Sequence, residues 1–412
     1  MTQRLSRSLP QVYAAAALRL LLPLLVLPLV ASRVGPDEFG RLSFILVWSS
    51  LLAMIVEGGF LAAATRLAVS ADAAGRWRLA QQVFTARCVL CVPAVLLSFV
   101  AARIAGHGGS AIDAPAIAAL ACTLGWPATW YLQATQQLAR WSRVELAVYG
   151  VLLLACWAFA RSVEAFVVLQ WAASAALALV GWGWLRRDLA TPGDAHLWAR
   201  PQLAPGLRLG WTMMPVSIAG AAYSFALPAA ASTQMTKPEL GLYFMADRMV
   251  RALLAAAEPV IAVVYPRIVA LFDGGARAAL RYAVRWAIGG ALAGAALLAV
   301  GVLLWPALEP LLAPRAGGIA LDRLRPVLLV LGGLLPLLMG WKFIGYWMLG
   351  SGRYDRAYRA CVLVGGIVGV FGAATWGGAA GAIGLAWTAL IVEAVVIAVA
   401  VLGMLLTPRR AP

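Results

Sequence analysis

The sequence predicts an all-α integral membrane protein with about twelve transmembrane helices, arranged as two six-helix lobes around a central cleft. Of its 412 residues, 63% are hydrophobic and 12% are charged, and the mean hydropathy of +0.86 lies well above that of soluble domains. Apolar stretches of about 20 residues, enough to cross a hydrocarbon layer about 30 Å thick, recur along the chain. These stretches lack the period-two alternation of barrel strands, which favours helices.

The individual spans are separated by short polar or glycine-rich connections. Gly377, Gly378 and Gly381 form the connection between the last two spans, which carries no charged residue. The spans are predicted at 11–32, 41–64, 80–104, 114–135, 144–161, 164–185, 209–233, 240–268, 283–306, 326–350, 359–378 and 380–406.

The longest polar connector, 186–208, divides the spans into six and six. We therefore predict an N-terminal lobe at 1–187, a cytoplasmic linker at 188–208 and a C-terminal lobe at 209–412. A short echo supports an internal repeat, because Glu38-Phe39-Gly40-Arg41-Leu42 precedes the second span and Glu239-Leu240-Gly241-Leu242-Tyr243 precedes the eighth. Parallel repeats of this kind place a binding site between the halves.

The distribution of basic residues predicts that both termini lie in the cytoplasm. With that orientation, 20 of the 33 Lys and Arg residues fall in cytoplasmic segments and eight on the opposite side. The net charge of +16 then reflects topology and attraction to anionic membrane lipids. The basic residues are scattered over short loops, so no nucleic-acid partner is expected. The first apolar segment is interpreted as a span and not as a cleaved signal.

Residue patterns that carry chemistry are mostly absent. The five cysteines lie in or at the ends of apolar spans, and His107 and His196 lie in separate loops, so no metal site is predicted. There is no Walker phosphate-binding loop. The sequence therefore predicts neither an enzyme nor a cofactor.

Several segments resemble bacterial polysaccharide-export flippases of the Wzx type, which belong to the multidrug/oligosaccharidyl-lipid/polysaccharide (MOP) exporter superfamily. The resemblance covers Val34–Gly40 with Glu57–Phe60 and Arg66, Lys237–Tyr243 through Tyr265–Arg267, Gly350–Tyr354, and Gly381–Trp387. Two features depart from the family pattern. Pro228–Ser232 lacks the acidic residue often found near the end of the seventh span, and Glu57 stands where Asp is more usual.

The resemblance implies a MATE/MOP-like fold and movement of a polyprenyl-(pyro)phosphate-linked oligosaccharide across the bacterial inner membrane. The glycan would serve O-antigen (lipopolysaccharide), capsule or exopolysaccharide synthesis. The implied partners are this glycan lipid, membrane lipids, and the polymerase and chain-length proteins of the same pathway.

A pyrophosphate head needs cationic groups at depth, and five basic residues lie inside predicted spans: Arg19, Arg87, Arg248, Arg251 and Lys342. A charge at the bilayer centre costs from about 2.5 to more than 10 kcal/mol, so these residues are candidate ligands of the anionic head. Two alternatives stay open. Arg87 is near enough to the cytoplasmic end to snorkel, and Asp247 and Glu258 could neutralise Arg248 and Arg251 within their own helix.

Candidate coupling residues are Glu57, Asp247 and Glu258, although Glu57 also suits the cytoplasmic end of the second span. Candidate sugar contacts are Tyr131, Gln133, Gln170 and Trp341. The simpler interpretation of most of the 17 tryptophans is anchoring at the membrane interface.

Three other functions remain as alternatives. A MATE-like drug antiporter would need acidic cavity residues, whereas basic residues are in excess inside the spans. A lipid II flippase is chemically closer, but that family tends to have two further spans. A membrane glycosyltransferase would present a large outer loop, and the connection 307–325 offers only Glu309 and Asp322 as acids.

Overall fold

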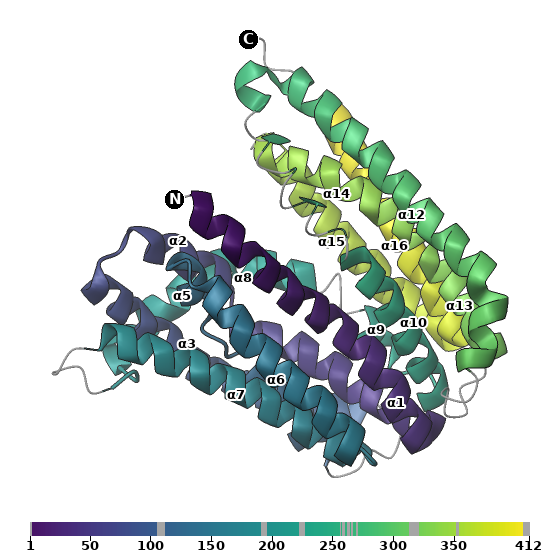
Figure 1. The fold of residues 1–412 in the computed structure, drawn as a ribbon, viewed down its shortest axis with the longest axis horizontal. Helices are drawn as coiled ribbons and strands as arrows, with labels where there is room; N and C mark the ends of the chain where they lie inside the picture. The colour runs from purple at the N-terminus through teal and green to yellow at the C-terminus, as the bar shows by residue number, and fades with distance from the viewer. Residues whose placement is uncertain are drawn as a thin grey trace. The chain divides into compact units, whose positions relative to one another are not determined.

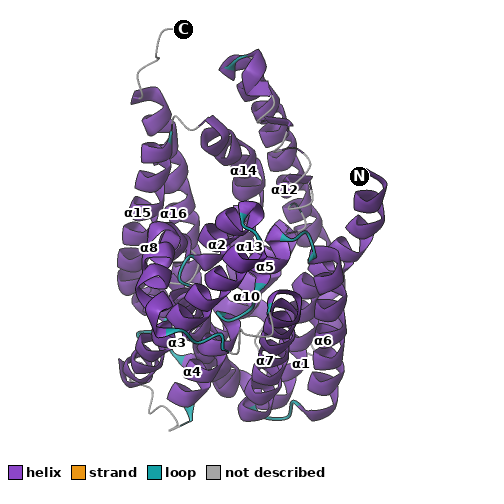
Figure 2. Ribbon diagram, turned by 90° about the vertical axis from the view of Figure 1, so that its left-hand side faces the viewer, coloured by secondary structure: helices purple, strands orange, loops and turns teal. Residues whose placement is uncertain are grey.

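The computed structural model describes residues 2–104, 112–190, 196–221, 227–255, 257, 260–261, 264, 267–268, 271–312, 321–351 and 354–406. Within these ranges every regular element is a helix (Figures 1 and 2). The predicted all-α membrane fold is confirmed. Each of the twelve predicted spans overlaps at least one described helix.

The helices between residues 2 and 231 correspond to predicted spans one to seven. They are α1 (Thr2–Glu57), α2 (Phe60–Ser70), α3 (Ala73–Ile104), α4 (Asp113–Leu124), α5 (Thr129–Ala134), α6 (Leu138–Phe159), α7 (Val163–Leu189), the 3₁₀ turn η1 (Arg200–Gln202), α8 (Leu203–Ala221) and α9 (Leu227–Ala231).

The remaining helices correspond to predicted spans eight to twelve. They are α10 (Lys237–Ala255), η3 (Leu271–Gly274), α12 (Ala276–Leu312), α13 (Leu321–Gly332), α14 (Leu334–Ser351), α15 (Asp355–Gly372), the π-helical turn η5 (Ala373–Gly377) and α16 (Gly378–Leu406).

Seven segments of the described residues are long and apolar enough to cross a membrane. They are Val26–Ser70, Ala73–Ile104, Arg140–Phe159, Val163–Leu189, Ala276–Ala307, Leu321–Met348 and Ala379–Leu406. Helix α10 does not belong to this set, because Lys237, Glu239, Asp247, Arg248 and Arg251 make it too rich in charge. It nevertheless overlaps the predicted eighth span, 240–268, from residue 240 to residue 255.

Several predicted spans are interrupted where the sequence disfavours a continuous helix. Gly35, with φ 81° and ψ 171°, separates the first two spans inside α1. Span 114–135 is divided into α4 and α5, because Pro127 lies in the connection and its preceding residue avoids helical backbone angles. Span 326–350 is likewise divided into α13 and α14 at Gly333.

Contacts divide the chain into two compact units. The first comprises residues 1–22 and 41–225, and the second comprises 23–40 and 226–412. In the first unit α8 packs against α2 and α3, and in the second α12 packs along α14 and α15 along α16 (Figure 1). The lobe boundaries at 187 and 209 stay a prediction, since they follow the polar connector and not these contacts.

A polar cluster joins the beginnings of three predicted spans in the first unit. Arg41, at the start of the second span, donates from Nε to Asp113 of α4 and from a terminal nitrogen to Glu164 of α7, both at 2.8 Å. Asp113 is only 3% exposed, so Arg41 is what makes its burial tolerable. According to the basic-residue distribution these ends face outward.

The second unit has a corresponding cluster with the charges reversed. Glu239, in the first turn of α10, forms an ion pair with Arg323 of α13 and accepts a hydrogen bond at 2.7 Å from the main-chain nitrogen of Ala382 in α16. Helices α10, α13 and α16 represent spans eight, ten and twelve, the counterparts of spans two, four and six. Both units therefore tie the same three span beginnings together.

Glycine is required where these connections come close. Gly381 has φ +59°, and a Cβ atom there would lie 2.5 Å from Oε2 of Glu239. At Gly40 a Cβ would lie 1.8 Å from the carbonyl oxygen of Lys237, within the same unit. The repeated Glu-x-Gly sequences thus owe their glycines to close backbone approach.

Replacing Arg41 with Gln is expected to destabilise the protein, because Asp113 then stays buried without its cation. Loss of one partner of a buried pair costs about 3–5 kcal/mol. The measurement is the melting temperature of the detergent-purified protein, followed by reaction of its free cysteines with a thiol dye. Asp113→Asn added to Arg41→Gln should recover part of the loss; equal melting of wild type and single variant would remove the cluster from the account.

Gly381→Ala is expected to lower the melting temperature, since it strains the backbone by about 1–3 kcal/mol and displaces Glu239. The matched control is Gly366→Ala in α15, where a Cβ meets nothing within 4 Å. That substitution should be neutral or slightly stabilising, as alanine is the better helix former. Similar losses in both variants would show that the close approach at Gly381 is unimportant.

Candidate functional site

The charged turn of α10, formed by Asp247, Arg248 and Arg251, is the site that the structure defines best. Pro238 occupies the second position of α10, where a missing amide hydrogen is tolerated, and the helix then runs unbroken to Ala255. Eleven residues separate Lys237 from Arg248, so at about 1.5 Å per residue Arg248 lies about 16 Å along the helix. That depth is near the middle of a hydrocarbon layer about 30 Å thick.

Arg251 is neutralised within its own helix. Its Nε lies 2.8 Å from both carboxylate oxygens of Asp247, one helical turn earlier. Asp247 is 8% exposed, whereas the Arg251 side chain is 39% exposed, so the buried member of the pair is the carboxylate. Local neutralisation, one of the two alternatives predicted from the spacing, therefore applies to Arg251.

Arg248 differs from its neighbour. Its guanidinium carbon lies 4.8 Å from the centroid of the Phe244 ring, a cation–π contact. Within the described part of the chain it forms no hydrogen bond and no ion pair. Arg248 is partly buried, and Asp247 acts on it electrostatically without a hydrogen bond. It is thus a cation at depth whose hydrogen-bond donors remain available to an anion.

Glu393 of α16 also belongs to this site and was not predicted. It is 7% exposed and close enough to Arg251 to act on it electrostatically. A sequence signal existed, because Glu393 is the one ionisable residue in the predicted span 380–406. The charged groups of α10 and α16 that influence one another are therefore two arginines and two carboxylates, and Arg251 is influenced by both acids.

The other predicted cations are less informative. Lys342 lies partly buried in α14. Arg19 lies in α1, but its side chain is outside the described residues, as is Glu258. Their predicted roles stay predictions.

Arg87 is bound to main-chain carbonyls inside the first unit. It is 1% exposed, and one terminal nitrogen donates to the carbonyl oxygens of Trp126 and Pro127 at 2.7 and 3.0 Å. These carbonyls lie in the break between α4 and α5, where helical partners are missing. Arg87 also lies over the Phe60 ring, with its guanidinium carbon 5.7 Å from the centroid. Its described contacts stabilise the broken span, and they do not resemble the snorkelling that the sequence suggested.

Glu57 is the last residue of α1, seven residues before the predicted end of the second span at 64. Its carboxylate accepts from the main-chain nitrogens of Gly59 at 2.9 Å and Leu61 at 2.6 Å. Both oxygens thus cap the beginning of α2. These contacts favour the helix-end interpretation over a coupling role.

The candidate sugar contacts differ in burial. Tyr131 is 2% exposed and its hydroxyl lies 3.1 Å from Asp188, so it packs inside the first unit. Gln133, two residues later in α5, is exposed. Gln170 and Trp341 are partly buried in α7 and α14. Of these residues, Tyr131 has the clearest structural role.

No group of three His, Cys, Asp or Glu side chains among the described residues could hold a metal ion.

Comparisons with solved structures identify the fold. The chain is similar to an inward-facing multidrug-resistance MATE family transporter of the MOP superfamily, at 14% identity and a TM-score of 0.64, covering 94% of each chain. It is similar to the lipid II flippase MurJ in an inward closed conformation, at 10% identity and a TM-score of 0.62, covering 96% of this chain and 88% of that one. A MOP transporter from Pyrococcus furiosus, described as having a binding pocket of reverse polarity, matches at 14% identity and a TM-score of 0.52, covering 97% and 93%.

Among curated proteins, none matches this sequence significantly. The family model described as "Polysaccharide biosynthesis protein" matches residues 13–272, well over half of the chain. This match includes α10 and its charged turn. The chain therefore belongs to the polysaccharide biosynthesis protein family and has the fold of MOP-superfamily transporters.

Proposed function

We propose that the protein is a flippase that moves a polyprenyl-(pyro)phosphate-linked oligosaccharide from the cytoplasmic to the outer leaflet of the bacterial inner membrane. The product would supply O-antigen, capsule or exopolysaccharide synthesis. Family membership supports the link to polysaccharides, and the MOP fold supports a transporter and not an enzyme.

The proposal rests on the lack of a hydrogen-bond or ion-pair partner for Arg248 among the described residues. A phosphate cannot enter hydrocarbon without compensation, and a partly buried arginine whose donors have no partner among the described residues supplies charge and forked hydrogen bonds. Arg251, by contrast, has already been compensated by Asp247. We therefore propose that Arg248 binds the anionic head group and that Arg251 holds the side chain of Asp247 in place.

The direction of transport agrees with the membrane potential. A negative cytoplasm drives an anionic head outward by about 2.3 kcal/mol per charge for each 100 mV. The predicted cytoplasmic termini and the excess of cytoplasmic arginines belong to the same proposal.

A MATE-like antiporter of cationic molecules is the second candidate, and the carboxylates of Asp247 and Glu393 are what favour it. In that case Glu393 would bind the transported cation, and removal of Arg248 would improve transport. The two functions thus predict opposite effects for one substitution.

Arg248→Gln is expected to slow flipping roughly ten- to hundredfold, the equivalent of about 1.5–3 kcal/mol for a hydrogen bond to a charged group. The assay uses proteoliposomes that contain a fluorescent polyprenyl-pyrophosphate disaccharide, and a membrane-impermeant reductant reports the leaflet. Arg248→Lys should keep part of the activity. Unchanged flipping by Arg248→Gln, or faster uptake of an organic cation, would contradict the assignment.

The neighbouring residue gives the matched comparison. Arg251→Gln is expected to lower the melting temperature, because the buried carboxylate of Asp247 loses its hydrogen-bonded cation. Since the Arg251 side chain is 39% exposed, the cost is that of a solvent-screened pair, about 1 kcal/mol. Arg248→Gln should leave the melting temperature within experimental error. If both variants melted alike, the division between a structural and a substrate-binding arginine would be wrong.

A further inference from the structure

An apolar groove lies on α10, α12 and α13 of the second unit, and its α10 residues include Met249 and Val250 of the charged turn. It has a volume of about 210 Å³ and is lined by leucines from all three helices, with Leu335 of α14 at one end. Met249, Val250 and Leu253 are its contribution from α10. Since a helix has about 3.6 residues per turn, these three side chains are centred on the side of α10 opposite Arg248 and Arg251. The groove is therefore separate from the proposed head-group site.

The groove runs along the helix that is least covered by protein. In the most apolar window of Ala276–Ala307, only 6% of residues are buried, and Leu297 and Val302 of the groove are 37% and 38% exposed. In a membrane protein such an apolar, uncovered surface faces acyl chains. A groove in it is accessible to a lipid from the side.

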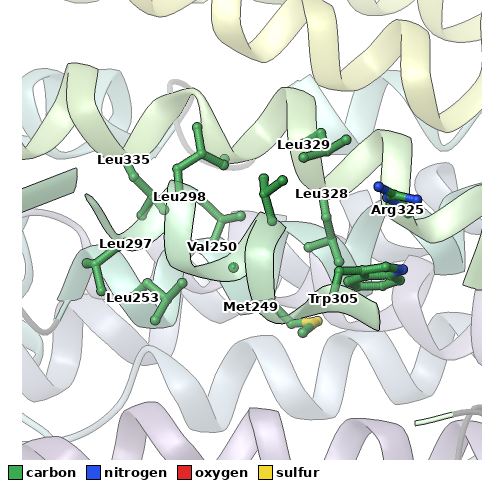
Figure 3. Close-up of a pocket in the computed structure, with 13 residues that line it drawn as sticks. Met249, Val250, Leu253, Leu297, Leu298, Trp305, Arg325, Leu328, Leu329 and Leu335 are labelled. Carbon is green, nitrogen blue, oxygen red and sulfur yellow. The ribbon is translucent and has the colours of Figure 1, made fainter. Parts of the chain in front are cut away.

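One cation stands at one end of this groove. Figure 3 shows Arg325 beside Trp305 at one end, with Leu335 and Leu297 at the other. Arg325 is exposed and, in the described part of the chain, has no hydrogen bond or ion pair, whereas nearby Arg323 is held by Glu239. The basic-residue distribution puts Arg325 at the outer surface. Trp305 is only 7% exposed, so the level of the lipid head groups is indicated by the exposed Arg325 at the end of the apolar surface.

We infer that this groove binds the transported lipid itself: the first part of a single prenyl chain lies in the groove, and its phosphate contacts Arg325 at the outer surface. This inference rests on the proposed function. A volume of about 210 Å³ holds roughly seven groups the size of a water molecule, at about 30 Å³ each, which is between one and two five-carbon prenyl units. A single narrow groove suits a one-chain lipid better than the paired chains of a phospholipid.

The site would act after translocation. The phosphate leaves Arg248, reaches the outer surface and is held there by Arg325, while the chain stays in the groove. Arg248 and Arg325 thus bind the same head group one after the other. Each arginine can be substituted while the other is kept.

The test is photolabelling of the full-length protein in phosphatidylcholine vesicles. The probe is a long-chain polyprenyl monophosphate with a photoreactive group near the phosphate end, and labelled peptides are identified by mass spectrometry. Label is expected on the groove faces of α10, α12 and α13. Arg325→Gln should reduce labelling roughly tenfold, as expected for loss of a charged hydrogen bond worth about 1.5 kcal/mol.

Matched variants separate the groove from general lipid contact. Val302→Trp fills the groove and should abolish labelling, whereas Leu303→Trp, on the adjacent outward face at 77% exposure, should not. Arg277→Gln, an exposed arginine at the other end of α12, controls for charge. Equal labelling by a photoreactive phosphatidylglycerol, or equal competition by unlabelled phosphatidylglycerol, would overturn the inference in favour of a phospholipid.

The same vesicles distinguish this inference from the proposed function. Normal flipping without label in the groove would overturn the inference and leave the flippase standing. Absence of flipping by the wild-type protein would overturn the proposed function. Arg248→Gln should slow flipping while the groove is still labelled, because the prenyl phosphate reaches Arg325 directly from the outer leaflet.

Discussion

The account depends on how each buried charge is compensated. In hydrocarbon an ionised side chain must be paired, hydrogen-bonded or reserved for a ligand. Arg41, Arg87 and Arg251 have fixed partners: acids at span ends, carbonyls at a helix break, and a carboxylate one turn away. Arg248 lies against a ring, and no acid among the described residues is within hydrogen-bonding distance of it. That difference, and not the number of basic residues, separates a substrate ligand from structural arginines.

The two units use one design with opposite charges. An arginine ties three span beginnings in the first unit, and a glutamate ties their counterparts in the second. Charge sign is therefore free to change during divergence of a repeat as long as each cluster stays neutralised. The short sequence echo at Glu38–Leu42 and Glu239–Tyr243 marks the connections where these clusters form, and its glycines permit the close approach of backbone.

Much of the fold could be predicted from local sequence, because hydropathy locates a span and proline or glycine marks its breaks. The ion pair of Asp247 and Arg251 was also accessible, since a separation of four residues places both on one helix face. The roles of Arg87 and Arg41 were not, because their partners lie 39 to 123 residues away. Glu393 is the one ionisable group in its predicted span, but an anionic substrate predicts cationic ligands, so this acid was not among the predicted site residues.

The most direct measurement of the central claim is the distance between the Arg248 guanidinium nitrogens and the phosphorus atoms of bound polyprenyl-pyrophosphate sugar. Solid-state NMR of protein with ¹⁵N-labelled arginine in lipid measures it, and Arg248→Lys assigns the signal. In an Arg325→Gln background, which removes the second proposed phosphate contact, the account predicts a nitrogen–phosphorus contact that disappears when Arg248→Lys is added. A contact that survives loss of Arg248 in this background, or its absence with substrate bound, would contradict the account.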